Sequence, residues 1–220
     1  MSNNIRAIVI GSTGATGKCL IQELLSSNRF SKVTSIVRKT DDTLKNDKLE
    51  QVVVDMENLG AYKELFRNKD AAFCCLGTTR KIAGSTENQK HIELDYSSAF
   101  SKLCKEGNVK TMHLVTSQGA NKDSWFFYPK LKGEIEEAMR VDNFDSLTIY
   151  RPGLLDRLTK DRATFENVLV AVLPSLKVST LAKSMRIACE KEFNEQDSSF
   201  IPPTKPVKIF YNSEIYNLAK

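Results

Sequence analysis

Three residues in the second half of the chain have the chemistry to move a proton. Tyr128 and Lys132 are four positions apart and share one face if the segment is helical. A tyrosine hydroxyl ordinarily has a pKa of about 10. A neighbouring ammonium stabilises the phenolate and so lowers that pKa toward neutral pH, where proton transfer becomes efficient. Ser117 follows an apolar run and can hydrogen-bond a carbonyl or alkoxide oxygen. The set predicts acid–base chemistry on a carbonyl or alcohol, with a surface Tyr and Lys pair as the alternative.

A glycine-rich stretch near the N-terminus predicts where a second reactant would be held. It lies between an apolar run, residues 5–10, and a segment with the apolar periodicity of a helix. Glycines at such a junction allow a tight turn, let a ligand approach the backbone and aim helix N–H groups at an anion. The expected ligand is the pyrophosphate of a dinucleotide, and the residues expected to bind it are Gly11, Ser12, Thr13, Gly14, Ala15, Thr16 and Gly17.

Other interpretations of these motifs fit less well. A GxxxxGK[ST] phosphate loop would need Gly where Ser12 stands and Ser or Thr where Cys19 stands, and a thiol is a poor Mg²⁺ ligand. A turn that serves only helix–strand packing remains the alternative for the glycines. A GxSxG hydrolase elbow around Ser117 fails because Val115 stands in place of the first Gly.

The arrangement of apolar segments predicts the architecture that positions these residues. Strand patterns occur at residues 5–10, 33–38, 50–54, 71–76, 111–116 and 146–150, and they alternate with helix patterns that include 59–67, 88–106 and 129–141. Such alternation is typical of an α/β fold, a Rossmann-type doubly wound parallel sheet with helices on both faces. We expect a single domain over residues 1–220, with the dinucleotide-binding core at about 5–153.

Residues 154–220 are expected to form a short cap of helices and one strand that shapes a substrate cleft. The sequence predicts a loop at 154–162, a helix that ends before Pro174, a helix after Ser179 with that serine as its N-cap, and a strand at 207–211. Ser213 is expected to cap a terminal helix.

Residues at the ends of the predicted strands are candidates for cofactor contacts, because ligands of open α/β sheets lie beyond the carboxyl ends of the strands. Arg38 lies 21 positions after Gly17, where an acidic residue would bind the ribose hydroxyl of NAD. A cation there favours the 2′-phosphate of NADP(H), although a solvated basic turn is the alternative. Asp55 could accept a hydrogen bond from adenine or could cap a helix. The remaining candidates are Lys39, Leu76, Gly77, Thr78, Thr79 and Arg80.

Composition excludes several other classes of function. The net charge is +5, but the basic residues are spread along the chain, so direct nucleic-acid binding is not expected. Five cysteines with no CxxC pair and only two histidines predict reduced thiols and no metal site. No apolar run of transmembrane length, signal peptide or transit segment is expected, which favours a cytoplasmic location.

Several motifs together resemble one family. They are GSTGATG, the segments at 30–33 and 74–80, Ser117-Gln118-Gly119-Ala120, Tyr128-x3-Lys132-Gly133-Glu134 and Arg151-Pro152-Gly153. The series is similar to the HIV Tat-interacting protein family of atypical short-chain dehydrogenases, with its fungal relatives. The resemblance implies NADPH binding, a Ser117, Tyr128 and Lys132 catalytic triad, and cofactor contacts that include Arg151 and Pro152.

The resemblance and the residues leave two functional hypotheses. One is an NADP(H)-dependent oxidoreductase that acts on a small carbonyl or alcohol substrate. The other is an NADPH-binding regulator that acts through protein partners with little turnover. The family also implies possible nuclear or peripheral mitochondrial outer-membrane locations besides the cytoplasm.

Overall fold

The sheet that the sequence predicts forms the centre of the fold. The computed structural model describes residues 4–156, 175–197 and 207–220. Seven parallel strands are hydrogen-bonded in the order β3-β2-β1-β4-β5-β6-β9. Their bounds are β1 Ile5–Ile10, β2 Phe30–Val37, β3 Leu49–Val53, β4 Ala71–Cys74, β5 Thr111–Val115, β6 Ser146–Tyr150 and β9 Val207–Phe210. The predicted α/β class with a doubly wound parallel sheet is therefore confirmed.

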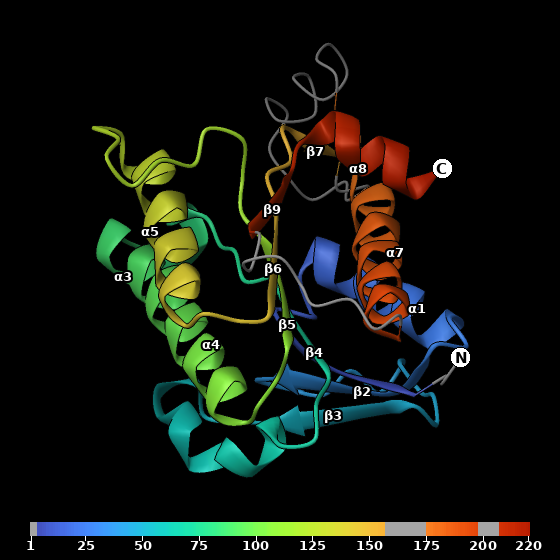
Figure 1. Ribbon diagram of the computed structural model, residues 1–220. Coiled ribbons are helices and arrows are strands. Elements are labelled where there is room, and N and C mark those ends of the chain that lie inside the picture. Colours follow the sequence, from blue (N-terminus) through green and yellow to red (C-terminus); the bar gives the residue numbers. More distant parts are fainter. Residues whose placement is uncertain (1–3, 157–174, 198–206) are drawn as a thin grey trace.

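Helices cover both faces of the sheet, as Figure 1 shows. On one face, α1 (Ala15–Ser26), α7 (Val178–Asp197) and α8 (Asn212–Ala219) enclose an apolar cluster that includes Val9 and Leu20. On the other, the 3₁₀ segment η1 (Met56–Phe66), α4 (Tyr96–Glu106) and α5 (Phe127–Val141) enclose a cluster that includes Ile8 and Phe100. Adjacent residues of β1 thus face opposite cores, which is why the strand is apolar without interruption from Ala7 to Ile10.

The helix expected at 88–106 is interrupted. The structure has α3 (Thr86–Lys90), then one π-helical turn, η2 (His91–Asp95), and only then α4. Ser85 caps α3, because its side chain accepts a hydrogen bond from the amide of Asn88 at 3.0 Å. A π turn changes the register of the residues that follow, and such turns are frequent at functional sites. The simple helical period did not predict this change.

The described part of the C-terminal segment has two roles. Strand β9 joins the sheet beside β6, and α7 packs on α1, so this segment completes the core. A short pair, β7 (Leu155–Asp156) and β8 (Leu176–Lys177), follows Gly153. Helix α7 begins at Val178, one residue before the expected cap Ser179, and α8 begins at Asn212 rather than after Ser213. Most of the loop predicted at 154–162 and the helix predicted before Pro174 lie outside the described residues.

The sheet order creates a crevice at the carboxyl end of β1. From β1 the chain continues to β2 and then to β3 at one edge of the sheet. From β4 it continues in the opposite direction, to β5 and then to β6. The loops after β1 and β4 therefore separate there, and this is where ligands of open α/β sheets are bound.

Candidate functional site

The glycine loop joins β1 to α1 at this crevice. Gly11 has φ +78°, and a Cβ there would lie 2.5 Å from the carbonyl carbon of Cys75, so only glycine fits. A Cβ on Gly17 would lie 2.2 Å from the carbonyl oxygen of Gly11. Gly14, the N-cap of α1, has only that oxygen within 4 Å, at 3.4 Å, and faces open space. Gly11 and Gly17 are therefore packing glycines, and Gly14 is the one that a ligand could approach.

The N-terminus of α1 has the character of an anion site. No side chain caps its first turn, and no acidic residue lies in that turn. The first amides of a helix have no partner within the helix, and the helix dipole places partial positive charge there. A phosphate would satisfy both the hydrogen bonds and the charge.

Two adjoining hollows open on either side of the glycine loop. The first, here called the Arg38 hollow, has a volume of about 510 Å³ and lies between the ends of β1 and β2 and the segment 82–96. The second, the Ser117 hollow, has about 530 Å³ and lies toward β5 and α5. Both are lined by Gly14, Cys75, Leu76, Gly77 and Thr78. The pair forms one long crevice with the glycine loop at its middle, and its shape suits a dinucleotide.

The three proton-transfer candidates all line the Ser117 hollow. The Oγ of Ser117 is buried and has no hydrogen-bond partner among the described residues. Tyr128 is half exposed, and the Nζ of Lys132 lies 5.5 Å from the centre of its ring. A buried hydroxyl without a partner is rare in native proteins, so Ser117 is placed to bind something in this hollow.

Glu93, which the sequence did not single out, lies beside this group. It is fully buried in the π turn, and its Oε2 is 2.6 Å from the Nζ of Lys132. Its Oε1 accepts hydrogen bonds from the amide of Thr78 at 2.9 Å and from the side chain of Gln89 at 3.1 Å. An acidic residue within an apolar helical pattern was the only signal in the sequence.

Arg38 lies where the sequence predicted it, at the end of β2 and on the wall of the Arg38 hollow. Lys39 is exposed and lines neither hollow. The hollow is also lined by residues that the sequence did not indicate, namely Met56, Ile82, Asn88, Ile92 and Tyr96. Among the described residues, Arg38 is thus the one cation on a wall that is otherwise formed by apolar and uncharged polar residues.

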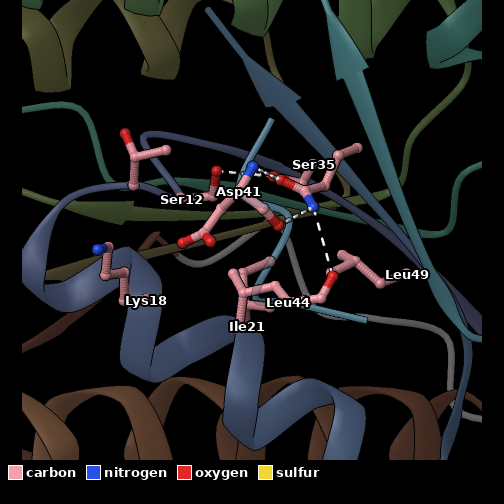
Figure 2. Close-up of a pocket in the computed structure, with 9 residues that line it drawn as sticks. Ser12, Lys18, Ile21, Ser35, Asp41, Leu44 and Leu49 are labelled. Atoms are coloured by element: carbon pink, nitrogen blue, oxygen red, sulfur yellow. Dashed lines mark hydrogen bonds between the residues drawn. The ribbon is translucent and has the colours of Figure 1, made fainter. Parts of the chain in front are cut away.

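Hydrogen bonds hold the loop after Arg38 against β3. Gln51 accepts a hydrogen bond from the amide of Asp41 at 2.8 Å and donates one to its carbonyl oxygen at 2.9 Å. These contacts border a small hollow of about 10 Å³. Lys18 and Asp41, which are among the residues on its wall, are labelled in Figure 2. Hydrogen bonds from Thr43, and then the charge of Lys18, lower the pKa of Asp41. This hollow is too small for a nucleotide, and its contacts fix the loop that follows Arg38.

Some side chains of the glycine loop line the two hollows, whereas that of Ser12 makes a hydrogen bond within the protein core. Thr13 lines the Arg38 hollow, whereas Ala15 and Thr16 line the Ser117 hollow. Ser12 is buried, and its Oγ accepts a hydrogen bond from Ser35 at 2.7 Å, so its side chain is used to join β1 and β2. Pro152 lines the Ser117 hollow together with Gln118, Leu154 and Leu155.

Three predicted cofactor residues line neither hollow, and two of them cap helices instead. Asp55 is the N-cap of η1 and accepts a hydrogen bond from the amide of Glu57 at 3.0 Å, which is the alternative that the sequence left open. Thr79 is the N-cap of α2 (Arg80–Ala83), and Arg80 is exposed in its first turn. The structure does not bring these side chains to the crevice.

Arg151 is also held away from the crevice. Its Nε and Nη2 donate to the two carboxylate oxygens of Glu136 at 2.8 and 2.6 Å, and its Nη1 donates to the hydroxyl of Tyr211 at 3.1 Å. Glu136 is almost completely buried and also accepts a hydrogen bond from Thr116. The paired carboxylate raises the pKa of Arg151 above its ordinary value. Its observed role is to compensate a buried charge.

Other kinds of site are not found in the described part of the chain. It contains no group of three or more His, Cys, Asp or Glu side chains arranged to hold a metal ion. All five cysteines have free thiols, and burial raises the pKa of Cys74, which disfavours the reactive thiolate. Among the residues that the structure describes, no helix combines the length and apolar character needed to cross a lipid bilayer.

Comparison with solved structures supports the fold. The oxidoreductase ylbE from Lactococcus lactis superposes with a TM-score of 0.67 at 18% identity, covering 97% of this chain and 96% of that one. MoeE5 in complex with UDP-glucose and NAD superposes with a TM-score of 0.70 at 14% identity, covering 94% of this chain and 75% of that one. At these identities the likeness concerns the fold.

Comparison of sequences identifies the family. The family model described as NAD(P)H-binding matches residues 11–170. Protein HTATIP2 of Rattus norvegicus is 40% identical over 154 residues, which is 69% of this chain but only 63% of that protein. The mitochondrial protein FMP52-1 of Scheffersomyces stipitis is 32% identical over 219 residues, covering 94% of this chain and 95% of that protein. The chain therefore belongs to the NAD(P)H-binding family and, within it, to the group that contains HTATIP2 and the fungal FMP52 proteins.

Proposed function

We propose that this protein is an NADP(H)-dependent oxidoreductase of the atypical short-chain dehydrogenase type, which reduces a carbonyl compound or oxidises the corresponding alcohol. The observation that carries the proposal is the buried Oγ of Ser117, which has no hydrogen-bond partner within the described part of the chain and shares its hollow with Tyr128 and Lys132. That hollow adjoins the glycine loop, so a bound nicotinamide and a carbonyl substrate would meet beside the three side chains.

Each of the three side chains has a distinct role in the proposed reaction. Bound NADPH supplies the hydride that the carbonyl carbon accepts. Ser117 donates a hydrogen bond to the carbonyl oxygen and so orients the substrate. Tyr128 gives its hydroxyl proton to that oxygen, which becomes the alcohol, and Lys132 stabilises the phenolate that remains. In the alcohol-oxidising direction the same proton returns to Tyr128.

The proposal is tested by following NADPH oxidation at 340 nm with a panel of aldehydes, ketones and quinones. We expect at least one class to be reduced, with the alcohol identified by mass spectrometry. NADPH that binds without any turnover across the panel would contradict the oxidoreductase proposal.

One surface feature favours the second candidate, a regulator that binds protein partners. The loop before α5 exposes Trp125 completely and Phe126 largely, and these residues precede Tyr128 by three and two positions. Exposed aromatic side chains of this size are common in binding surfaces. If no substrate is reduced and NADPH changes the binding of a partner to this loop, the regulator would replace the enzyme as the proposed function.

The preference for NADP(H) rests on Arg38. We expect Arg38→Ala to weaken NADPH binding by roughly 10- to 100-fold, the range for loss of a charge-assisted hydrogen bond. NADH binding should change little, because NADH has no 2′-phosphate. Isothermal titration calorimetry with both cofactors measures the difference. Lys45→Ala is the matched control, since it removes a charge from the same loop at a residue that lines neither large hollow; equal losses for both cofactors would refute the assignment.

A further inference from the structure

Glu93 is a fully buried acidic residue whose carboxylate pairs with Lys132 of the proposed active site. Its carboxylate has three hydrogen-bond partners, and each comes from a different element of the fold. Gln89 belongs to the same helical segment, Thr78 to the loop after β4, and Lys132 to α5. The carboxylate therefore joins the cofactor-binding loop to the helix that carries Tyr128.

The contact with Lys132 is a buried ion pair. The side chain of Lys132 is 5% exposed and that of Glu93 is 0% exposed, with the two charged atoms 2.6 Å apart. A lysine ammonium on a four-carbon stem has many conformations, and burial without a counter-charge is strongly unfavourable. The carboxylate both selects one position for the ammonium and makes its burial possible.

The π turn explains why an acidic residue can reach this position. A continuous α-helix through residues 86–106 would keep one apolar stripe in the core, whereas η2 widens the helix by one residue where Glu93 occurs. The flanking residues of the turn, His91 and Asp95, bind each other on the outside at 2.8 Å. Of the two acidic residues in the turn, Asp95 binds His91 and Glu93 is directed inward to Lys132.

We propose that Glu93 is the positioning residue of the active site, which holds the ammonium of Lys132 over the ring of Tyr128. The inference rests on the proposed oxidoreductase function, but the geometry it concerns exists independently of turnover. Glu93 itself touches neither the substrate nor the transferred proton; it acts through Lys132.

The first test observes Lys132 directly. In protein labelled with ¹⁵N-lysine, an ammonium held by a buried carboxylate exchanges its protons slowly and gives a ¹H–¹⁵N resonance, which Lys132→Met assigns. We expect Glu93→Gln to abolish this resonance and Glu93→Asp, which keeps the carboxylate, to retain it in part. Glu134→Gln is the matched control, because Glu134 is on α5 but pairs with Lys90 at 2.8 Å. A resonance that persists unchanged in Glu93→Gln would overturn the proposal.

The second test separates positioning from stability. With 9,10-phenanthrenequinone as the probe carbonyl, we expect Glu93→Gln to lower kcat at least about tenfold, as misplacement of a reactive group does. The KM for the quinone and the Kd for NADPH should stay close to those of the unaltered protein, and Glu93→Asp should recover part of kcat. If Glu93→Gln and Glu93→Asp both lower the melting temperature and lose kcat equally, Glu93 has only a structural role.

The two proposals can fail separately. If the unaltered protein does not reduce the quinone or any other carbonyl, the oxidoreductase function is wrong, and the lysine resonance still decides whether Glu93 positions Lys132. If turnover is found but is insensitive to Glu93→Gln, the function stands and the positioning role is wrong.

Discussion

Replacement of Tyr128 by Phe is expected to lower kcat for carbonyl reduction by about 10²- to 10⁴-fold, the usual contribution of a positioned general acid. The substitution removes one oxygen atom and keeps the ring above which the Lys132 ammonium lies. Tyr128 is 46% exposed, so loss of its hydroxyl should leave the melting temperature nearly unchanged. Steady-state kinetics with any reduced carbonyl, together with NADPH titration, measure the effect.

Another exposed tyrosine provides the control for this prediction. Tyr216→Phe also removes an exposed hydroxyl, one that donates to the carbonyl oxygen of Ser175, and Tyr216 lines neither large hollow. It should leave kcat unaltered. Full activity in Tyr128→Phe would mean that another group supplies the proton and that the proposed mechanism is incorrect.

The second large effect is expected at Gly14. Its backbone, at φ −75° and ψ 170°, is in the extended region that valine prefers, and no atom other than the Gly11 oxygen lies within 4 Å of a Cβ there. Gly14→Val should therefore fold. Its side chain would occupy the space between the two hollows, and we expect NADPH affinity to fall by at least about 100-fold, or ~2.7 kcal/mol. Fluorescence titration and thermal unfolding measure the two properties separately.

Substitutions at two other glycines serve as controls for this prediction. Gly60→Val adds the same side chain at an exposed position with no atom within 4 Å and should leave NADPH affinity unchanged. Gly17→Val should instead prevent stable folding, because even its Cβ would lie 2.2 Å from a backbone oxygen. Normal NADPH affinity in folded Gly14→Val would show that the cofactor does not approach the glycine loop as proposed.

The sequence by itself determined the features that depend on local pattern. Alternating apolar segments predicted the parallel sheet, because a strand buried on both faces consists mostly of apolar residues. The spacing of Tyr128 and Lys132 predicted their common face on α5, since helical geometry fixes which residues are neighbours four positions apart. The glycine spacing predicted the turn after β1, because Gly11 has a positive φ and a Cβ there would collide with the backbone of Cys75.

The tertiary structure decided which charged groups meet. Glu93 and Lys132 are 39 positions apart, and no local period relates them. Arg151 matched a cofactor motif by its sequence, yet a buried carboxylate on α5 binds it, because leaving Glu136 unpaired would cost several kcal/mol. Asp55 similarly caps η1. The partner of a charged side chain depends on which elements the fold packs together and on which charges are buried away from water. The spacing of residues along the chain determines neither.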